Sequence, residues 1–206
     1  NNANLTGANL TGANLTNADV SFAKLTGANL YGATLTGANL GGATLTGVRS
    51  GGIEGSPIMW QLPNWTVVSG YLIGPDADLT GADLTGANLN NANLTGANLT
   101  DAKLANAILT GAKLANAILT GADLNADLTG VRSGGITTTP AALPTDGTLL
   151  NGYLIGPGVD LTGVNFTGVN FTGVNFTGAN FTRANLTRAN LTDANLTNTN
   201  LTGVRS

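Results

Sequence analysis

Apolar and polar residues alternate along this chain in units of five, and the alternation restarts in every unit. In the commonest unit, Ala-Asn-Leu-Thr-Gly, the alanine and leucine face one side of an extended backbone and the asparagine faces the other. A longer strand would continue this alternation, so the Thr-Gly pair must turn the chain, and glycine tolerates the positive φ that a turn requires. Each unit therefore predicts one short side and one corner of a coil.

The repeat divides the chain into three blocks, and a strict internal period of this kind predicts a solenoid. The blocks span residues 1–47, 76–130 and 158–206. In such a fold each coil contacts only its neighbours, so stability is a sum of local contacts along a rod rather than the product of one central core. Each buried leucine contributes roughly 1.5–3 kcal/mol to that sum.

The unit resembles the repeat of the pentapeptide repeat family, whose consensus is Ala-(Asn/Asp)-Leu followed by two variable residues. The resemblance implies an all-β fold, a right-handed quadrilateral β-helix, in which four units make one coil with the leucine or phenylalanine and the small residue inside. Under this expectation one interior layer of the third block is filled by four phenylalanines: Phe166, Phe171, Phe176 and Phe181.

Two related inserts, residues 48–75 and 131–157, interrupt the repeat. Each follows Gly-Val-Arg-Ser and ends in Gly-Tyr-Leu-Ile-Gly-Pro, which indicates a duplicated module. Within each, two short apolar runs flank a turn pair, Ser69-Gly70 in the first and Asn151-Gly152 in the second. Such a pair between apolar runs predicts a β-hairpin. A third Gly-Val-Arg-Ser at residues 203–206 is interpreted as the beginning of a third insert, and hence of a longer array.

The inserts also hold the concentrated aromatic residues, which are the main candidates for an interaction surface. They are Trp60, Trp65 and Tyr71 in the first insert and Tyr153 in the second. Two interpretations stay open: the rings pack the hairpin onto the rod, or they bind a partner. The recurring arginines, Arg49, Arg132 and Arg205, are expected to cap nearby carbonyl groups, with an anion site as the alternative.

Two isoleucines of the second block, Ile108 and Ile118, take outward positions where most units have asparagine. They are candidate contacts to a partner or an insert, although scattered exposed apolar residues are ordinary. The aspartates are too dispersed for a catalytic carboxylate pair, and they are interpreted as surface substitutes for asparagine.

Composition excludes several classes of function. The chain has no cysteine and no histidine, so disulfides, thiolate or imidazole metal sites and nucleophile-histidine pairs are absent. We therefore expect no enzyme activity, no cofactor and no metal. Only 9% of residues are charged, with a net charge of −3, which provides no basic stripe for nucleic acid. No apolar run approaches the ~20 residues that span a bilayer.

These observations predict a non-enzymatic structural or scaffold protein. A rigid rod whose terminal coils expose strand edges would self-associate end to end into an array, filament or fibre. An extracellular or cell-surface location is expected, with the cytoplasm as the alternative. Two other functions stay open: an interaction module like the family members that mimic DNA and bind topoisomerases, and an ice or polysaccharide binder that uses ladders of asparagine and threonine.

Overall fold

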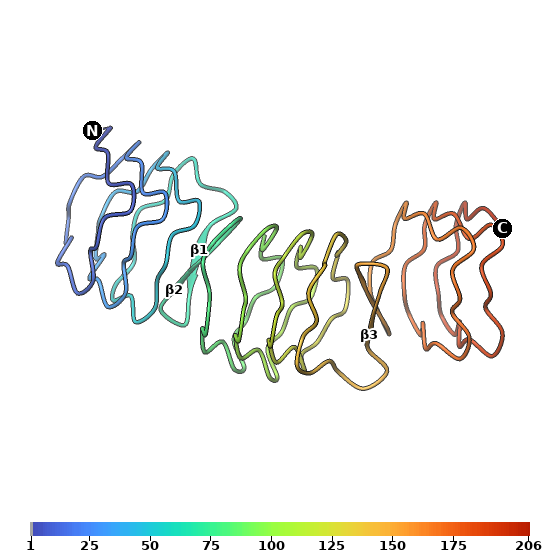
Figure 1. The fold of residues 1–206 in the computed structure, drawn as a ribbon. Coiled ribbons are helices and arrows are strands. Elements are labelled where there is room, and N and C mark those ends of the chain that lie inside the picture. Colours follow the sequence, from blue (N-terminus) through green and yellow to red (C-terminus); the bar gives the residue numbers. More distant parts are fainter. Residues whose placement is uncertain (1) are drawn as a thin grey trace.

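The computed structural model describes residues 2–206 as an elongated rod of stacked coils (Figure 1). Three stacks follow one another along the rod, and a hairpin lies between each pair of stacks. The first hairpin consists of β1 (Thr66–Val68) and β2 (Tyr71–Ile73), and the second of β3 (Thr148–Leu150) and β4 (Tyr153–Ile155). Residues 2–206 contain no helix, hence none that could cross a membrane. The expected all-β solenoid is confirmed.

The backbone ladder shows that four units make one coil. Asn4 pairs in parallel with Lys24, and Lys24 pairs with Thr44, so that one coil takes 20 residues. The same step recurs in the third block, where Asn165 pairs with Asn185 and Asn185 with Arg205. The quadrilateral coil expected from the repeat is therefore confirmed.

A single unit shows why this sequence adopts the coil, because every one of its N–H groups has a partner. In the unit 97–101, the N–H of Ala97 donates to the preceding leucine carbonyl across the corner, at 3.1 Å. Asn98 donates to the coil before, while Leu99 and Asp101 donate to the coil after. The remaining N–H, of Thr100, donates to the side-chain Oδ1 of Asn98 at 3.1 Å. A buried backbone must pair its polar groups, and the five-residue repeat does so completely.

The corner itself is a tight turn that requires a positive φ. The N–H of Ala8 donates to the carbonyl of Leu5 at 3.0 Å, and Gly7, the third residue of the turn, has a φ of 65°. This is the pattern of a type II turn, in which glycine is favoured. Other residues take the same place with a similar φ, as at Asp101 and Arg183, with 56° and 58°. The corner therefore tolerates substitution but prefers glycine.

The ladder runs on into the inserts, past the boundaries expected at residues 47 and 130. Thr34 pairs with Glu54 and Asn39 with Ile58 in the first insert, and Asp123 pairs with Ala142 in the second. Glu54 keeps the 20-residue step, whereas Ile58 and Ala142 lie 19 residues after their partners and still pair in the ladder. The first part of each insert therefore forms sides of a coil, and only its second part forms the hairpin.

Both hairpins lie where the sequence places them, and they share one register. Val67 pairs with Leu72 and Leu149 with Leu154, each at the middle of three antiparallel pairs. The turn residues Ser69 and Gly70 have φ values of 50° and 77°. Two positive φ values define a type I′ turn, which matches the twist of a two-stranded ribbon.

Leucine and alanine fill the interior of the first two blocks, whereas phenylalanine fills that of the third. The four expected phenylalanines are fully buried, and neighbouring rings along the chain meet edge to face with centroids 4.9–5.1 Å apart. Edge-to-face contacts of this kind add about 0.5–1.5 kcal/mol each to the burial of the rings. The predicted aromatic layer is confirmed.

Candidate functional site

At each junction between blocks, the parallel backbone ladder continues from one stack to the next on one side of the rod. On other sides the hairpin lies between the two stacks. At the first junction Arg49 pairs with Asp78. At the second, the N–H of Asp160 donates to the carbonyl of Val131 at 3.0 Å. Figure 1 shows the hairpins between the stacks at these two places. The candidate site is therefore a pair of sister junctions, the first around Arg49 and the second around Arg132.

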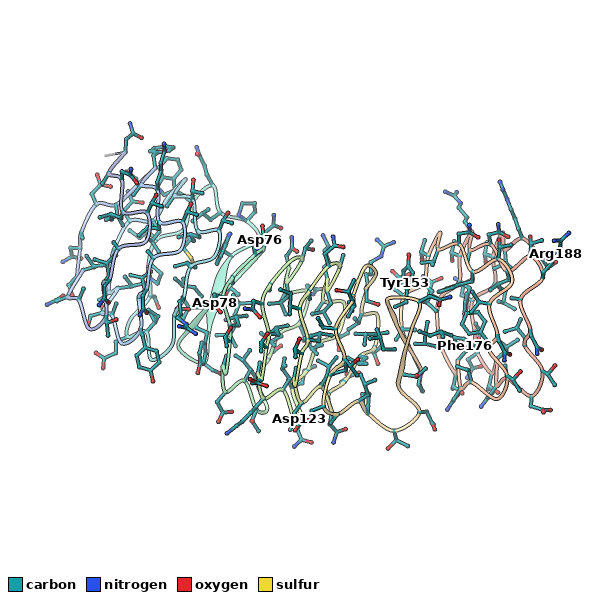
Figure 2. All side chains as sticks on the ribbon, in the orientation of Figure 1. Asp76, Asp78, Asp123, Tyr153, Phe176 and Arg188 are labelled. Carbon is teal, nitrogen blue, oxygen red and sulfur yellow. The ribbon has the colours of Figure 1, made fainter. Side chains whose placement is uncertain are left out.

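An ion pair marks the continuous side of each junction. The Nε of Arg49 lies 3.5 Å from Oδ2 of Asp78, and the Nε of Arg132 lies 3.1 Å from Oδ2 of Asp160. Figure 2 shows Asp78 beside the first hairpin. The sequence predicted that these arginines cap carbonyl groups, and that prediction is wrong, because the partner is the aspartate that opens the next block. Both arginine side chains are about half exposed, so each pair contributes little to stability.

A serine and a tyrosine hold each hairpin against the neighbouring coils. The N–H of Leu72 donates to Oγ of Ser50 at 2.8 Å, and the N–H of Leu154 donates to Oγ of Ser133 at 2.9 Å. The hydroxyl of Tyr71 accepts a hydrogen bond from the N–H of Asp83 at 3.1 Å. Sequence reasoning missed the serines, although their recurrence after each arginine was a signal for them.

Tyr153 takes the place of Tyr71 at the second junction and packs differently. Its ring meets Phe166 edge to face, with centroids 5.3 Å apart. It also covers Gly134, where a Cβ would lie 2.9 Å from the ring. Figure 2 shows Tyr153 between the second and third stacks. Tyr71, together with Tyr31, covers Gly51 in the same way, which explains why the Gly-Val-Arg-Ser of each insert is followed by glycine.

Each junction has an open cleft beside its arginine. The first cleft measures about 330 Å³, and it is lined by Tyr31, Arg49, Ser50, Tyr71 and Thr80 among others. The second measures about 550 Å³, and its lining includes Lys113, Arg132, Ser133, Tyr153, Asp160 and Thr162. Arginine, serine, tyrosine and threonine thus line both clefts, because the same module builds both junctions.

The two tryptophans of the first insert lie apart and in different surroundings. Trp60 is 43% exposed, its ring meets Phe22 edge to face at 5.4 Å, and its Nε1 donates to Oδ1 of Asn39 at 2.9 Å. The Trp60 ring lies on Gly41, where a Cβ would come within 2.0 Å of it. Phe22 is 45% exposed, and nothing in the repeat pattern predicted this pair, which joins residues two coils apart.

Trp65 is half-buried between the first two stacks. It packs against the core clusters on both sides of the first hairpin, and its ring covers Gly74. The packing interpretation fits Trp65, whereas Trp60 presents part of its ring to solvent. That these aromatic residues bind a partner stays a prediction.

Ile108 and Ile118 are exposed, at 41% and 40%, and they lie on different sides of the rod. Ile108 stands in the ladder between Asn88 and Asp127, and Ile118 pairs with Asn98. The structure therefore brings them together neither with each other nor with the tryptophans.

Six aspartates act as asparagine does in the repeat, accepting a hydrogen bond from the residue two places on: Asp19, Asp78, Asp83, Asp123, Asp127 and Asp160. For Asp101 and Asp193 the expectation is wrong, because they take the corner position with a positive φ. Hydrogen bonds from the Thr85 side chain and backbone lower the pKa of Asp83, and the N–H of Thr129 lowers the pKa of Asp127. Oδ2 of Asp127 also accepts from the Thr110 hydroxyl at 3.2 Å. Across residues 2–206 no three or more acidic residues gather into a group that could hold a metal ion.

The repeat can now be compared with known families. The model of the family described as pentapeptide repeats matches in eight copies, over residues 1–30, 13–49, 76–111, 92–132 and 165–203, which together make up well over half of the chain. The chain belongs to the pentapeptide repeat family. The matches leave out both hairpins, so the junctions are additions to the family's repeat. No match was found among curated protein sequences.

Several solved structures resemble this pentapeptide repeat protein. HetL of the cyanobacterium Nostoc, involved in heterocyst differentiation regulation, is 26% identical, with 98% of this chain and 86% of HetL covered and a TM-score of 0.34. A thylakoid-lumen pentapeptide repeat protein of Arabidopsis thaliana is 30% identical over 64% of this chain and 68% of its own, at a TM-score of 0.26. QnrB1, a plasmid-mediated fluoroquinolone resistance protein, is 19% identical, with coverages of 98% and 84% and a TM-score of 0.28.

Proposed function

We propose that this protein is a non-catalytic structural rod that associates end to end with further copies of itself. The observation that carries the proposal is that the two faces of each coil are complementary. Within the rod each unit's leucine N–H donates to the coil after, as Leu186 does to Arg205, and each asparagine N–H donates to the coil before, as Asn29 does to Ala8.

Both kinds of N–H group lack this partner at the end coils. Among residues 2–206, the N–H groups of Leu196 and Leu201 have no acceptor in a following coil, and those of Asn9 and Asn14 have none in a preceding coil. A second copy placed on either end would supply the missing groups and continue the parallel ladder. Such a contact joins two different faces and therefore builds a line rather than a closed dimer.

The apolar surface at the ends supports the same proposal. Leu201 in the last coil is 43% exposed, whereas Leu99 in the middle of the rod is fully buried. A stacked copy would bury Leu201 as the next coil buries Leu99. Burial of a leucine stabilises by roughly 1.5–3 kcal/mol. The apolar surface and the backbone ladder therefore both favour end-to-end stacking.

The test is the mass of the particle as the protein concentration rises, measured by light scattering and by electron microscopy. We expect rods whose length grows with concentration. Leu201→Lys places a charge on the end face and should leave single rods, because the charge would be buried without a partner in the stack. Asn200→Lys is the matched control, since Asn200 points outward, and it should assemble as the parent does. Single rods of the parent protein at every concentration would contradict the proposal.

The other two functions receive less support from the geometry. An ice binder must present its threonine hydroxyls to the ice lattice, but here many of them donate to an asparagine Oδ1 in their own unit, as in Thr11 and Thr192. A DNA mimic needs a strongly acidic surface, and the chain has 11 acidic against 8 basic residues. The extracellular location stays a prediction of composition.

A further inference from the structure

The two junction clefts share a framework and differ at several positions, two of which bear on binding. Arginine, serine, tyrosine and threonine recur in both linings, whereas an aspartate, Asp160, lines only the second. In the ladder, Asn29 pairs with Arg49 at the first junction, and Lys113 pairs with Arg132 at the second. Two residues further on, the first cleft has Tyr31 and the second has Ala115. The smaller alanine leaves the second cleft wider, at about 550 Å³ against about 330 Å³.

The lysine also changes the charge of the second cleft. Asp160 offsets Arg132, with which it forms an ion pair, and Lys113 adds a second cation. The lining of the second cleft therefore has two cations and one aspartate. The lining of the first cleft has one cation, Arg49, which forms an ion pair with Asp78 outside that lining. The Arg132 ion pair is made by Nε at 3.1 Å, and the arginine side chain is still about half exposed, so it remains accessible to a ligand. Both cations can donate to one bound carboxylate.

The rest of the second lining consists of hydroxyl and amide groups beside an aromatic ring. Thr95, Thr162 and Asn165 line it together with Tyr153. The hydroxyl of Thr162 donates to Asp160, so its oxygen can still accept a hydrogen bond. Groups that both donate and accept, next to an apolar ring, suit a small ring molecule that carries several hydroxyls.

We propose that the second junction cleft binds an acidic sugar, a uronic-acid residue. Its carboxylate lies between Lys113 and Arg132, and its hydroxyls contact Thr95, Thr162 and Asn165. The first cleft is narrowed by Tyr31 and has no lysine, so we expect it not to bind this ligand. It therefore serves as an internal control within the same chain.

The experiment is a titration of the full chain, followed by calorimetry and by NMR, with three probes: D-glucuronate, D-glucose and inorganic phosphate. We expect glucuronate to bind about tenfold more tightly than glucose, the difference that one charge-assisted hydrogen bond provides. Phosphate should bind more weakly than glucuronate, because it has no ring hydroxyls for the threonines. A longer oligomer of the uronic acid tests whether the cleft takes a residue within a chain or a free monosaccharide.

Two variants give the second cleft the residues of the first. Lys113→Asn should lower the affinity for glucuronate about tenfold through loss of the charge-assisted bond. Ala115→Tyr should lower the affinity for glucuronate and glucose alike by filling the cleft. Lys103→Asn, the matched control on another side of the same stack, should leave binding unchanged. The proposal is overturned if glucose or phosphate binds as tightly as glucuronate, if nothing binds, or if Lys103→Asn weakens binding as much as Lys113→Asn does.

Discussion

The two hairpins share strand lengths, register and the place of their turns, yet they divide the core of the rod differently. At the first junction Leu72 packs with the core cluster on the N-terminal side, and Ile73 packs with the cluster on the C-terminal side. At the second junction Leu154 and Ile155 belong to one cluster, which continues into the third block. Neighbouring residues of a strand face opposite ways, so each hairpin is a partition with one face toward each stack.

The residues that meet the partition explain the difference. At the second junction Tyr153 reaches Phe166, and the ring contacts run on from Phe166 to Phe171. At the first junction the equivalent place is taken by Leu84, which offers no such ring. Buried side chains therefore join the two stacks across the second hairpin, whereas at the first hairpin the buried residues form two clusters that meet through the half-buried Trp65.

The largest loss of stability should come from a charged residue on the buried face of a hairpin. Leu72→Asp and Leu154→Asp each bury a carboxylate without a partner and should cost more than about 4 kcal/mol in the free energy of unfolding. Hydrogen exchange should show the loss of protection mainly in the first block for Leu72→Asp, because Leu72 packs with that cluster alone. For Leu154→Asp it should spread over the second and third blocks, and an equal spread for both variants would contradict the separation.

A smaller effect is expected from the ring that bridges the second junction. Phe166→Ala should lower the free energy of unfolding by about 3–5 kcal/mol through the lost ring and the cavity left behind, measured by denaturant unfolding. A double-mutant cycle of Phe166→Leu with Tyr153→Leu should show a coupling of about 0.5–1.5 kcal/mol. No coupling between the two residues would mean that the rings do not link the stacks.

Next comes the glycine that admits Trp65 to the first junction. A Cβ at Gly74 would meet the Trp65 ring at 2.1 Å, so Gly74→Ala must displace the indole. We expect a loss of about 1–3 kcal/mol, together with a shift in tryptophan fluorescence. The control is Gly74→Ala in a Trp65→Leu background, where the indole that the new Cβ meets is gone. The loss caused by Gly74→Ala should be smaller in that background, and an equal loss would mean that the indole is not the cause.

The smallest expected effect is on thermal stability at low pH. The pKa of Asp127 is lower in the folded state than its ordinary value of 3.8, so its charged form stabilises the fold above that value. This contribution is lost as the pH falls through the lowered folded pKa. Asp127→Asn keeps the acceptor for Thr129, so the thermal midpoint should fall less below pH 3.8 than in the parent. Asp83→Asn should change this slope less, because the Asp83 carboxylate has no bond to a neighbouring coil like that from Thr110. A slope unchanged by Asp127→Asn would count against the assignment.

Local pattern predicted the coil, the corner and both hairpins, because each depends on residues within one unit or one turn. Oδ1 of Asn98 accepts a hydrogen bond from the N–H of Thr100 two residues away, and Ser69-Gly70 forms the turn of its own hairpin. Both features depend on residues that lie close together in the sequence. The candidate site was harder. Arg49 and Asp78 are brought together only when the chain returns after the hairpin, and Phe22 meets Trp60 only through the stacking of coils.

The sequence by itself determined the unit and its inward and outward faces, since these follow from the alternation within five residues. The four units per coil were implied by the resemblance to the family, and the backbone ladder shows them. Only the tertiary structure decided how the inserts are used: which side carries the ladder across, which way Leu72 and Ile73 face, and how wide each cleft is. These depend on side chains that lie a coil or more apart, such as Tyr31 and Tyr71 over Gly51. A difference of one residue there, alanine for tyrosine, changes a narrow cleft into an open one without any change in the repeat.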